Sequence, residues 1–134
     1  EGFEAEHGGG FADAGVDRWV RGDEKALSAS AQRGFALFNG KARCASCHGG
    51  WNFTDHRFHD IGLATTDEGR AKITGRTEDK HGFRTPGLRE ITARAPYMHN
   101  GSLPTLEAVV AHYATGGIDR PSRSRLMTSL SLTG

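Results

Sequence analysis

The sequence contains few cysteines, no long apolar run and almost no excess of charge of either sign. Cys44 and Cys47 are its only cysteines, too few for a zinc site that needs two further ligands of comparable spacing. No apolar stretch approaches the roughly 20 residues of a membrane-spanning helix, so we expect no membrane span. The formal net charge of +1 gives no reason to expect a nucleic acid or an acidic protein as a partner.

Composition limits the size of the fold. The 134 residues are enough for one domain with one modest hydrophobic core. Only 36% of the residues are hydrophobic, and 19 are glycines. Such a loop-rich and apolar-poor chain is typical of a domain in which a large, flat cofactor provides much of the core surface.

The strongest motif is Cys44-Ala45-Ser46-Cys47-His48, which has the C-x-x-C-H pattern that attaches a c-type haem. Two thiols add to the two vinyl groups of one porphyrin, so they must lie about one helical turn apart, and the following histidine supplies an imidazole nitrogen to the iron. The alternatives are a zinc half-site or a redox dithiol, in which His48 would be incidental. A thioredoxin-like dithiol requires a βαβ context, which the sequence does not show. We therefore predict one covalent haem c, held by Cys44, Cys47 and His48.

The haem motif also predicts the compartment. Both cysteines are used by the haem, which leaves none for a disulfide. Because thioether attachment is usually completed outside the cytoplasm, we expect the periplasm or its equivalent. The sequence begins at Glu1 without a signal peptide, which we interpret as a processed or cut end.

Capping residues and apolar spacing predict two helices. Ser28 can cap a helix that runs to about Asn39, and Thr105 can cap a second helix that runs to about Ala114. A glycine follows closely after each predicted end. Apolar residues recur on one face of each helix at intervals of three and four residues. Tyr113 belongs to the apolar face of the second helix.

These features predict a mostly α, cytochrome c-like haem domain, in which few short helices and long loops wrap around one covalent haem. We place this domain at residues 17–134, after a flexible, glycine-rich N-terminal arm at residues 1–16. Residues 17–25 are polar and are expected to be irregular, with Trp19 as an anchor. The tail from Ile118 offers no candidate for the closing C-terminal helix that a cytochrome c domain normally has.

Four loop residues are candidate contacts of the cofactor. Trp51 and Phe53 follow the haem motif and are candidate walls of its pocket. Arg84 and Arg89 are candidate partners of the haem propionates, because a guanidinium group pairs with a carboxylate through two hydrogen bonds. The alternative for both arginines is an ordinary place at the surface.

Two histidines in the same region form an H-x-x-H pair, His56 and His59. They lie in a loop rich in glycine and aspartate. We expect them to be solvated or to hydrogen-bond a propionate, and a second metal bound between them is the less favoured alternative.

A series of short motifs follows in a characteristic order along the chain. They are Asp17-Arg18-Trp19, Arg33-Gly34-Phe35-Ala36-Leu37-Phe38, Cys44 to His48, Phe53-Thr54-Asp55, Phe58-His59-Asp60-Ile61-Gly62, Phe83-Arg84-Thr85-Pro86-Gly87-Leu88-Arg89, Ala95-Pro96-Tyr97-Met98-His99-Asn100-Gly101-Ser102, and Thr105 to Val110 with Tyr113. In this order they resemble the C-terminal haem domain of the bacterial di-haem cytochrome c peroxidase and MauG family, and the MauG branch most closely. The resemblance extends from Trp19 to Pro121.

The resemblance bears on the second axial ligand of the iron. Ordinary members of the family use a methionine in the helix after the Pro-Tyr-x-His motif, and the MauG branch carries a ligating tyrosine there, the position of Tyr113 in this chain. Helical phase agrees, because His112 points roughly 110° away from the apolar face that holds Tyr113. Met98 is the main alternative, since methionine is the usual second ligand of electron-carrying cytochromes c. A vacant position, His99 and His112 complete the alternatives, and Tyr113 could also be a buried tyrosine whose hydroxyl bonds a backbone carbonyl.

The resemblance implies two haems, a peroxide-binding one in an N-terminal domain and an electron-relay one in the C-terminal domain, whereas this chain has a single C-x-x-C-H motif. We therefore expect it to relay electrons as a subunit or separated half of a MauG/cytochrome c peroxidase-like di-haem system. Its partner would be a redox protein, such as a second haem-bearing chain or domain. The family also binds calcium between its domains, through backbone carbonyls near Arg94 and Pro96, and we expect that half-built site to be empty here.

An enzymatic function is the alternative to electron relay. The chain would then be a peroxidase or a peroxide-driven oxidase of a protein substrate, an oxidoreductase that works together with a second haem-bearing chain. His99 is the first candidate for its acid/base residue. A third alternative, a haem-dependent scaffold without redox function, is disfavoured by covalent attachment of the haem.

Overall fold

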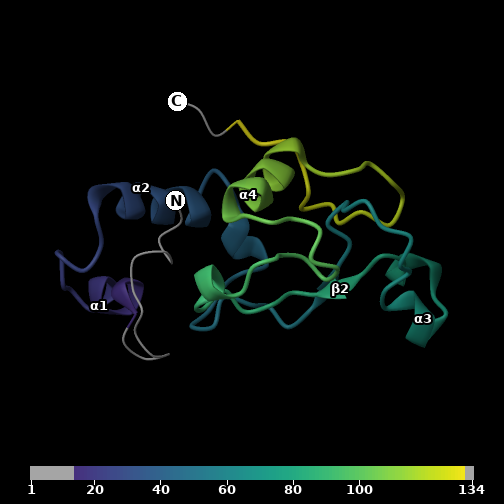
Figure 1. Ribbon diagram of the computed structural model, residues 1–134, viewed down its shortest axis with the longest axis horizontal. Helices are drawn as coiled ribbons and strands as arrows, with labels where there is room; N and C mark the ends of the chain where they lie inside the picture. Colours follow the sequence, from purple (N-terminus) through teal and green to yellow (C-terminus); the bar gives the residue numbers. More distant parts are fainter. Residues whose placement is uncertain (1–13, 132–134) are drawn as a thin grey trace.

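Short helices joined by long loops make up the described part of the chain, which is residues 14–131 of a computed structural model (Figure 1). Its four α-helices are α1 (Gly15–Val20), α2 (Ala29–Asn39), α3 (Ala71–Thr74) and α4 (Leu106–Thr115). Single turns of 3-10 helix occur at η1 (Cys44–Ser46), η2 (Thr77–Asp79) and η3 (Ile91–Ala93). The few short helices and the long loops agree with the sequence-based expectation. No helix in residues 14–131 is long and apolar enough to cross a membrane.

The two predicted helices are present, and their caps are the predicted residues. The Ser28 side chain accepts a hydrogen bond from the Ala31 amide at 3.1 Å at the start of α2. Thr105 accepts one from the Ala108 amide, also at 3.1 Å, at the start of α4. Each helix begins after its cap because the hydroxyl satisfies one of the amides that lack a partner inside the helix.

The sequence-based prediction for residues 17–25 was partly wrong, because α1 extends from Gly15 to Val20. This six-residue helix has no side-chain cap, so local signals for it are weak. Tertiary contacts stabilise it instead: Trp19 packs edge-on against Phe35 of α2, with ring centroids 5.2 Å apart. Most of the expected arm, residues 1–16, lies outside the described residues, but Val16 at its end is buried in the core.

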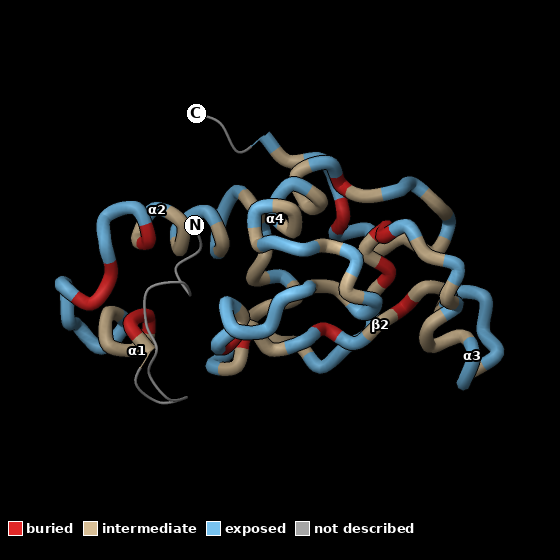
Figure 2. Tube along the Cα trace, viewed as in Figure 1, coloured by how far each residue is buried: buried red, intermediate tan, exposed pale blue. Residues whose placement is uncertain are grey.

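The main hydrophobic cluster lies at one end of the domain. Its buried residues are Val16, Leu27, Ala31 and Phe53, which come from α1, the α1–α2 connection, α2 and the turn after the haem motif. Figure 2 shows buried segments at α1 and α2 and others among the loops toward and around β2. The chain between these buried segments is mostly half-buried or exposed. None of the residues of η1 or α4 is buried, although α4 is largely apolar.

A two-stranded antiparallel sheet and a set of loop contacts hold the other end of the domain. β1 (Phe58–His59) pairs with β2 (Phe83–Arg84), so that Phe58 faces Arg84 and His59 faces Phe83. The described tail, residues 116–131, contains no helix. It is attached to the residue after β1 through buried Asp60, whose carboxylate accepts hydrogen bonds from Arg120 and Ser122.

Candidate haem site

The C-x-x-C-H motif forms a tight turn that follows α2. Cys44 begins η1, and the His48 amide donates to the Cys44 carbonyl at 2.9 Å, as in a turn of α-helix. Both cysteines are half-buried and neither forms a disulfide. Burial raises the pKa of both thiols, and the nearby charge of Asp55 raises that of Cys47 further. The turn therefore offers two protonated thiols and one imidazole on a single short segment.

His48 has the geometry of an iron ligand. Its Nδ1 lies 2.7 Å from the carbonyl oxygen of Phe53, to which it donates. Burial lowers the pKa of the imidazole, so the ring is neutral and its proton resides on Nδ1. The lone pair of Nε2 is then available to a metal, since the hydrogen bond at one ring nitrogen fixes the tautomer at the other.

Tyr113 of α4 lies near the two cysteines. The pKa of Tyr113 is raised to about 12, mainly because burial disfavours the phenolate and also because of electrostatic repulsion from Cys47 and Cys44. Its hydroxyl has no hydrogen bond to any residue within 14–131. The other tyrosine, Tyr97, donates to the Ile91 carbonyl at 2.7 Å. Tyr113 is half-buried, and a phenol shielded from water without a hydrogen-bond partner is costly, so the structure does not support the alternative in which the Tyr113 hydroxyl bonds a backbone carbonyl.

These observations fit a haem c. Cys44 and Cys47 would form its thioethers, His48 would bind the iron from one side, and the unpartnered hydroxyl of Tyr113 is suited to bind it from the other. The apolar face of α4 would cover the porphyrin, which explains why an apolar helix has no buried residue when only protein atoms surround it.

Arg89 has a different role from either of those predicted. It is not a surface arginine, because only 5% of its side chain is exposed. Its guanidinium pairs with the Asp17 carboxylate at 2.7 and 2.9 Å. Its Nε donates to the Trp51 carbonyl at 2.7 Å. The sequence predicted a haem propionate as the partner of Arg89, whereas the structure pairs it with the carboxylate of Asp17 in α1.

Two of the remaining candidate cofactor contacts, Trp51 and Arg84, are exposed, whereas Phe53 is buried in the main hydrophobic cluster. Trp51 is 71% exposed, so the protein residues alone do not enclose a pocket with Trp51 as its wall. Arg84 is exposed at the end of β2, and its guanidinium donates to His56 Nδ1 at 2.9 Å. Contact of Trp51 or Arg84 with the haem stays a prediction.

The alternative axial ligands occupy other environments. The His99 ring stacks on Phe83, with centroids 3.6 Å apart, and burial lowers its pKa. His112 donates a hydrogen bond from Nε2 to the Ile61 carbonyl at 2.8 Å, so this ring nitrogen is already engaged by the protein. Met98 is half-buried in a left-handed backbone conformation, with φ of 70°.

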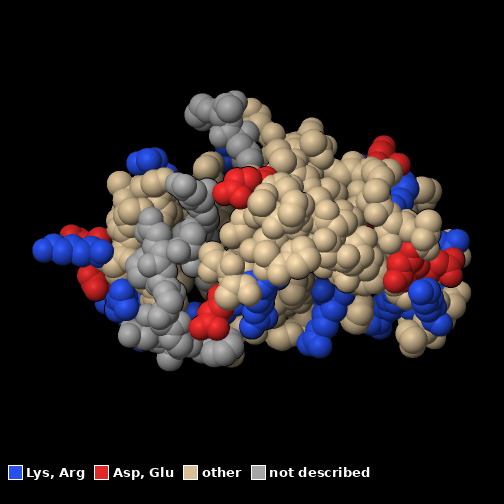
Figure 3. All heavy atoms as spheres, viewed as in Figure 1, with Lys and Arg blue, Asp and Glu red and all other residues tan. Residues whose placement is uncertain are grey.

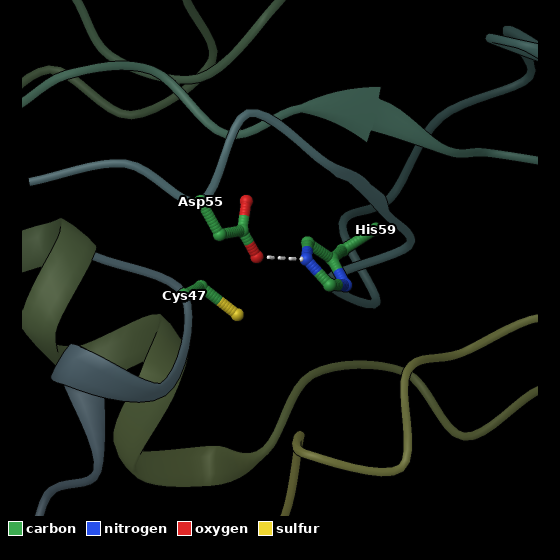
Figure 4. A group of neighbouring side chains, drawn as sticks. All are labelled: Cys47, Asp55 and His59. Atoms are coloured by element: carbon green, nitrogen blue, oxygen red, sulfur yellow. Dashed lines mark hydrogen bonds and ion pairs between the residues drawn. The ribbon is translucent and has the colours of Figure 1, made fainter. Parts of the chain in front are cut away.

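One cluster beside the haem motif was not predicted from the sequence. Cys47 Sγ, the Asp55 carboxylate and the His59 ring lie within 4.8 Å of one another (Figure 4). His59 Nε2 is 2.7 Å from Asp55 Oδ2. Burial would raise the pKa of Asp55, but hydrogen bonds from the Arg57 amide, His59 and Thr85 lower it to about 2. Asp55 and His59 are spaced like a helical pair, yet Asp55 lies in a loop and His59 in β1, so periodicity offered no signal for their contact.

The H-x-x-H pair does not converge on one point. His59 bonds Asp55, whereas His56 accepts from Arg84. Neither contact was predicted from the sequence, and a hydrogen bond from either histidine to a propionate stays a prediction. The arrangement gives no support to a second metal bound between them.

The fold and the site together define a c-type cytochrome domain, and a family model for RoxA-like, cytochrome c-like domains matches residues 82–115. The chain is 54% identical to the methylamine utilization protein MauG of Methylorubrum extorquens over 115 residues. The aligned region covers 84% of this chain and 33% of that protein. The chain is 49% identical to the MauG of Methylophilus methylotrophus, over 90% of this chain and 37% of the relative. It is 38% identical to the cytochrome c peroxidase Ccp of Escherichia coli, over 73% of this chain and 23% of the relative.

A solved structure agrees with these relatives. A MauG-like protein associated with microbial copper homeostasis superimposes with a TM-score of 0.82 and 31% identity, covering 91% of this chain and 47% of that one. The chain belongs to the MauG and cytochrome c peroxidase family. It spans about a third of the length of the curated MauG relatives that it matches.

Proposed function

We propose that this chain is the electron-relay domain of a MauG/cytochrome c peroxidase-like di-haem system, with one haem attached to Cys44 and Cys47 and its iron bound by His48 and Tyr113. The observation that carries the proposal is the hydrogen bonding of the two proposed ligands, which leaves one atom of each available to the iron. His48 has its Nδ1 engaged by a carbonyl, and the Tyr113 hydroxyl has no partner in residues 14–131. When bound, haem c supplies a one-electron ferric/ferrous couple.

The protein residues determine how that couple behaves. Cys44 and Cys47 tether the porphyrin, and His48 is oriented by the Phe53 carbonyl. Tyr113 would hold the iron as a phenolate, because a cation favours the anionic form of its ligand. A phenolate ligand would favour the ferric state and would leave no room for substrate at the Tyr113 position. The domain would therefore be hard to reduce and suited to electron transfer without substrate binding at this iron.

A second haem-bearing domain or chain is the proposed redox partner. The greater length of the relatives supports it, because this chain accounts for only about a third of a MauG protein. Surface character supports a protein partner as well. Figure 3 shows mostly uncharged side chains over the middle of the viewed face, beside one acidic group close to α4, and Val110 of α4 is 55% exposed. The proposed compartment is the periplasm, since covalent haem attachment is usually completed there.

Peroxide chemistry is the second candidate function. The names of several relatives favour it, including cytochrome c peroxidases 39% and 38% identical to this chain. The domain would then act with a second haem-bearing chain as a peroxidase or a peroxide-driven oxidase of a protein substrate. His99 is the candidate acid/base residue, with a ring held against Phe83 and close to the Thr65 hydroxyl. Peroxide turnover that requires the added second chain would support this candidate.

The electron-relay proposal is tested on the haem-loaded protein. Its mass and Soret absorbance report attachment, and the low-temperature EPR and near-infrared spectra of the ferric protein report the axial ligands. We expect a His/Tyr signature that is lost in Tyr113→Phe and retained in Tyr97→Phe, a matched control whose hydroxyl bonds Ile91. A methionine-to-iron charge-transfer band in the wild-type protein would instead assign Met98. Rapid peroxide turnover by the isolated chain would overturn the relay function.

A further inference from the structure

The buried guanidinium of Arg89 joins α1 to the turn that follows the haem motif. It contacts Asp17 through two hydrogen bonds and the Trp51 carbonyl through a third. Its Cζ also lies 5.4 Å from the centroid of the Phe53 ring. Asp17 is only a quarter exposed, and the side-chain hydrogen bond from Arg89 lowers its pKa, so both partners are charged at neutral pH. Arg89 thus fixes a carbonyl and contacts an aromatic ring of the same four-residue turn.

That turn provides the Phe53 carbonyl, which accepts the 2.7 Å hydrogen bond from His48 Nδ1, and the Pro86 carbonyl is a further backbone partner of the imidazole. Phe53 itself has a left-handed backbone with φ of 54°. This conformation is unfavourable for a bulky residue and persists only where its surroundings hold it. Two features hold it here. The Phe53 ring is buried against Phe38 in the core, and the Arg89 guanidinium anchors Trp51 two residues before it.

We propose that Arg89, held in place by Asp17, is a positioning residue for the haem ligand His48, because it fixes the turn whose Phe53 carbonyl orients the imidazole. The inference rests on the proposed function, since it requires a haem whose iron is bound by His48. Arg89 acts through the turn, by its hydrogen bond to the Trp51 carbonyl.

The consequence follows from the chemistry of a ligating histidine. A hydrogen bond from Nδ1 to a carbonyl makes the imidazole a stronger donor at Nε2, which favours ferric iron. If the turn relaxes, this hydrogen bond lengthens and the ferric state loses part of that preference. Weakening the contacts of Arg89 should therefore raise the reduction potential of the bound haem.

The experiment compares two buried arginine–aspartate pairs in the haem-loaded protein. Arg89→Lys keeps the charge, but an ammonium group cannot serve Asp17 and the Trp51 carbonyl in the planar geometry of a guanidinium. Asp17→Asn leaves Arg89 in place without its counter-charge. Arg120→Lys is the matched control, because Arg120 forms a similar two-pronged pair with buried Asp60 at the opposite end of the domain. Each variant is measured by potentiometric titration, by EPR of the ferric state and by thermal unfolding.

We expect all three variants to unfold at lower temperature and only Arg89→Lys and Asp17→Asn to shift the potential upward. The expected shift is about tenfold in the ferric-to-ferrous equilibrium, which is about 59 mV for a one-electron couple. An unchanged potential and EPR spectrum in both variants would overturn the proposal, as would an equal shift in Arg120→Lys. The proposed function fails separately, if the wild-type protein carries no haem or its spectra exclude His48 as a ligand.

Discussion

At the scale of single residues, the site depends on which polar atoms are already engaged by the protein. The Tyr97 hydroxyl donates to Ile91, whereas that of Tyr113 has no partner within residues 14–131. His112 bonds Ile61, and His48 leaves Nε2 available while its Nδ1 bonds Phe53. Helical phase separated Tyr113 from His112 in the sequence, and the hydrogen bonds of the structure support the same choice. Assignment of Tyr113 as the axial ligand stays a prediction.

Exchange of Tyr113 for methionine tests this assignment, because it replaces the oxygen of the proposed ligand with a thioether sulfur. A thioether favours ferrous iron, whereas a phenolate favours ferric iron, so Tyr113→Met should raise the reduction potential by on the order of hundreds of millivolts. The measurement is a redox titration followed by optical spectroscopy. Met98→Leu is the control and should leave the potential close to that of the wild type. A large shift in Met98→Leu with none in Tyr113→Met would reverse the assignment.

At the scale of elements, α2 and α4 are positioned by hydroxyl caps. Ser28 and Thr105 each satisfy an amide at the start of a helix. These caps were predictable because their interactions lie within a few residues of one another in the sequence. The helix α1 was not predicted, since it depends on packing of Trp19 against Phe35.

Removal of the α2 cap should weaken the domain measurably. Ser28→Ala leaves the Ala31 amide without its acceptor, and we expect the free energy of unfolding to fall by about 1 kcal/mol. Urea unfolding followed by circular dichroism gives this quantity. Ser30→Ala, an exposed site in the same helix, is the control and should change stability by less than about 0.5 kcal/mol. Equal effects of the two changes would refute the capping role.

The contact of Asp60, the residue after β1, with Arg120 and Ser122 of the tail should make the stability of the domain depend on pH. Burial would raise the pKa of Asp60, but hydrogen bonds from Arg120, Ser122 and the Gly62 amide lower it. The unfolded state therefore binds more protons near the pKa of this group, and the stabilisation present above about pH 4 is lost as the pH falls through the folded-state pKa.

Asp60→Asn should reveal this dependence. Loss of one partner of a buried pair costs about 3 kcal/mol at pH 7, and the difference from the wild type should shrink at pH 3. Urea unfolding at the two pH values measures both quantities. Asp119→Asn removes a carboxylate that is 88% exposed and should cost less than about 1 kcal/mol. A destabilisation of Asp60→Asn that is the same at both pH values would contradict the account.

At the scale of the whole molecule, the protein alone provides a modest core. The main cluster lies beside α1 and α2, and no large side chain within residues 14–131 is fully buried. The half-buried middle of the chain contains η1 and the apolar helix α4 (Figure 2). A cofactor that binds only the folded state would add its binding free energy to stability.

Loss of haem attachment should therefore disrupt the fold. In the double variant Cys44→Ser and Cys47→Ser, we expect complete loss of covalent haem and of cooperative thermal unfolding, measured by mass and near-ultraviolet circular dichroism. Ser46→Ala changes an exposed residue of the same motif and should retain both. A double variant that unfolds cooperatively at the wild-type temperature would show that the protein core suffices by itself.

The sequence by itself determined the features that depend on neighbouring residues: the haem motif, the caps of α2 and α4, and the family. Only the tertiary structure decided which distant groups meet. It paired Arg89 with Asp17 across 72 positions and brought Asp55 and His59 to Cys47. Spacing predicts such features only when a helix or strand makes it regular, whereas contacts between loops depend on how the whole chain packs. For that reason the sequence predicts the residues that would hold the cofactor, and the structure provides the contacts that we propose keep those residues in place.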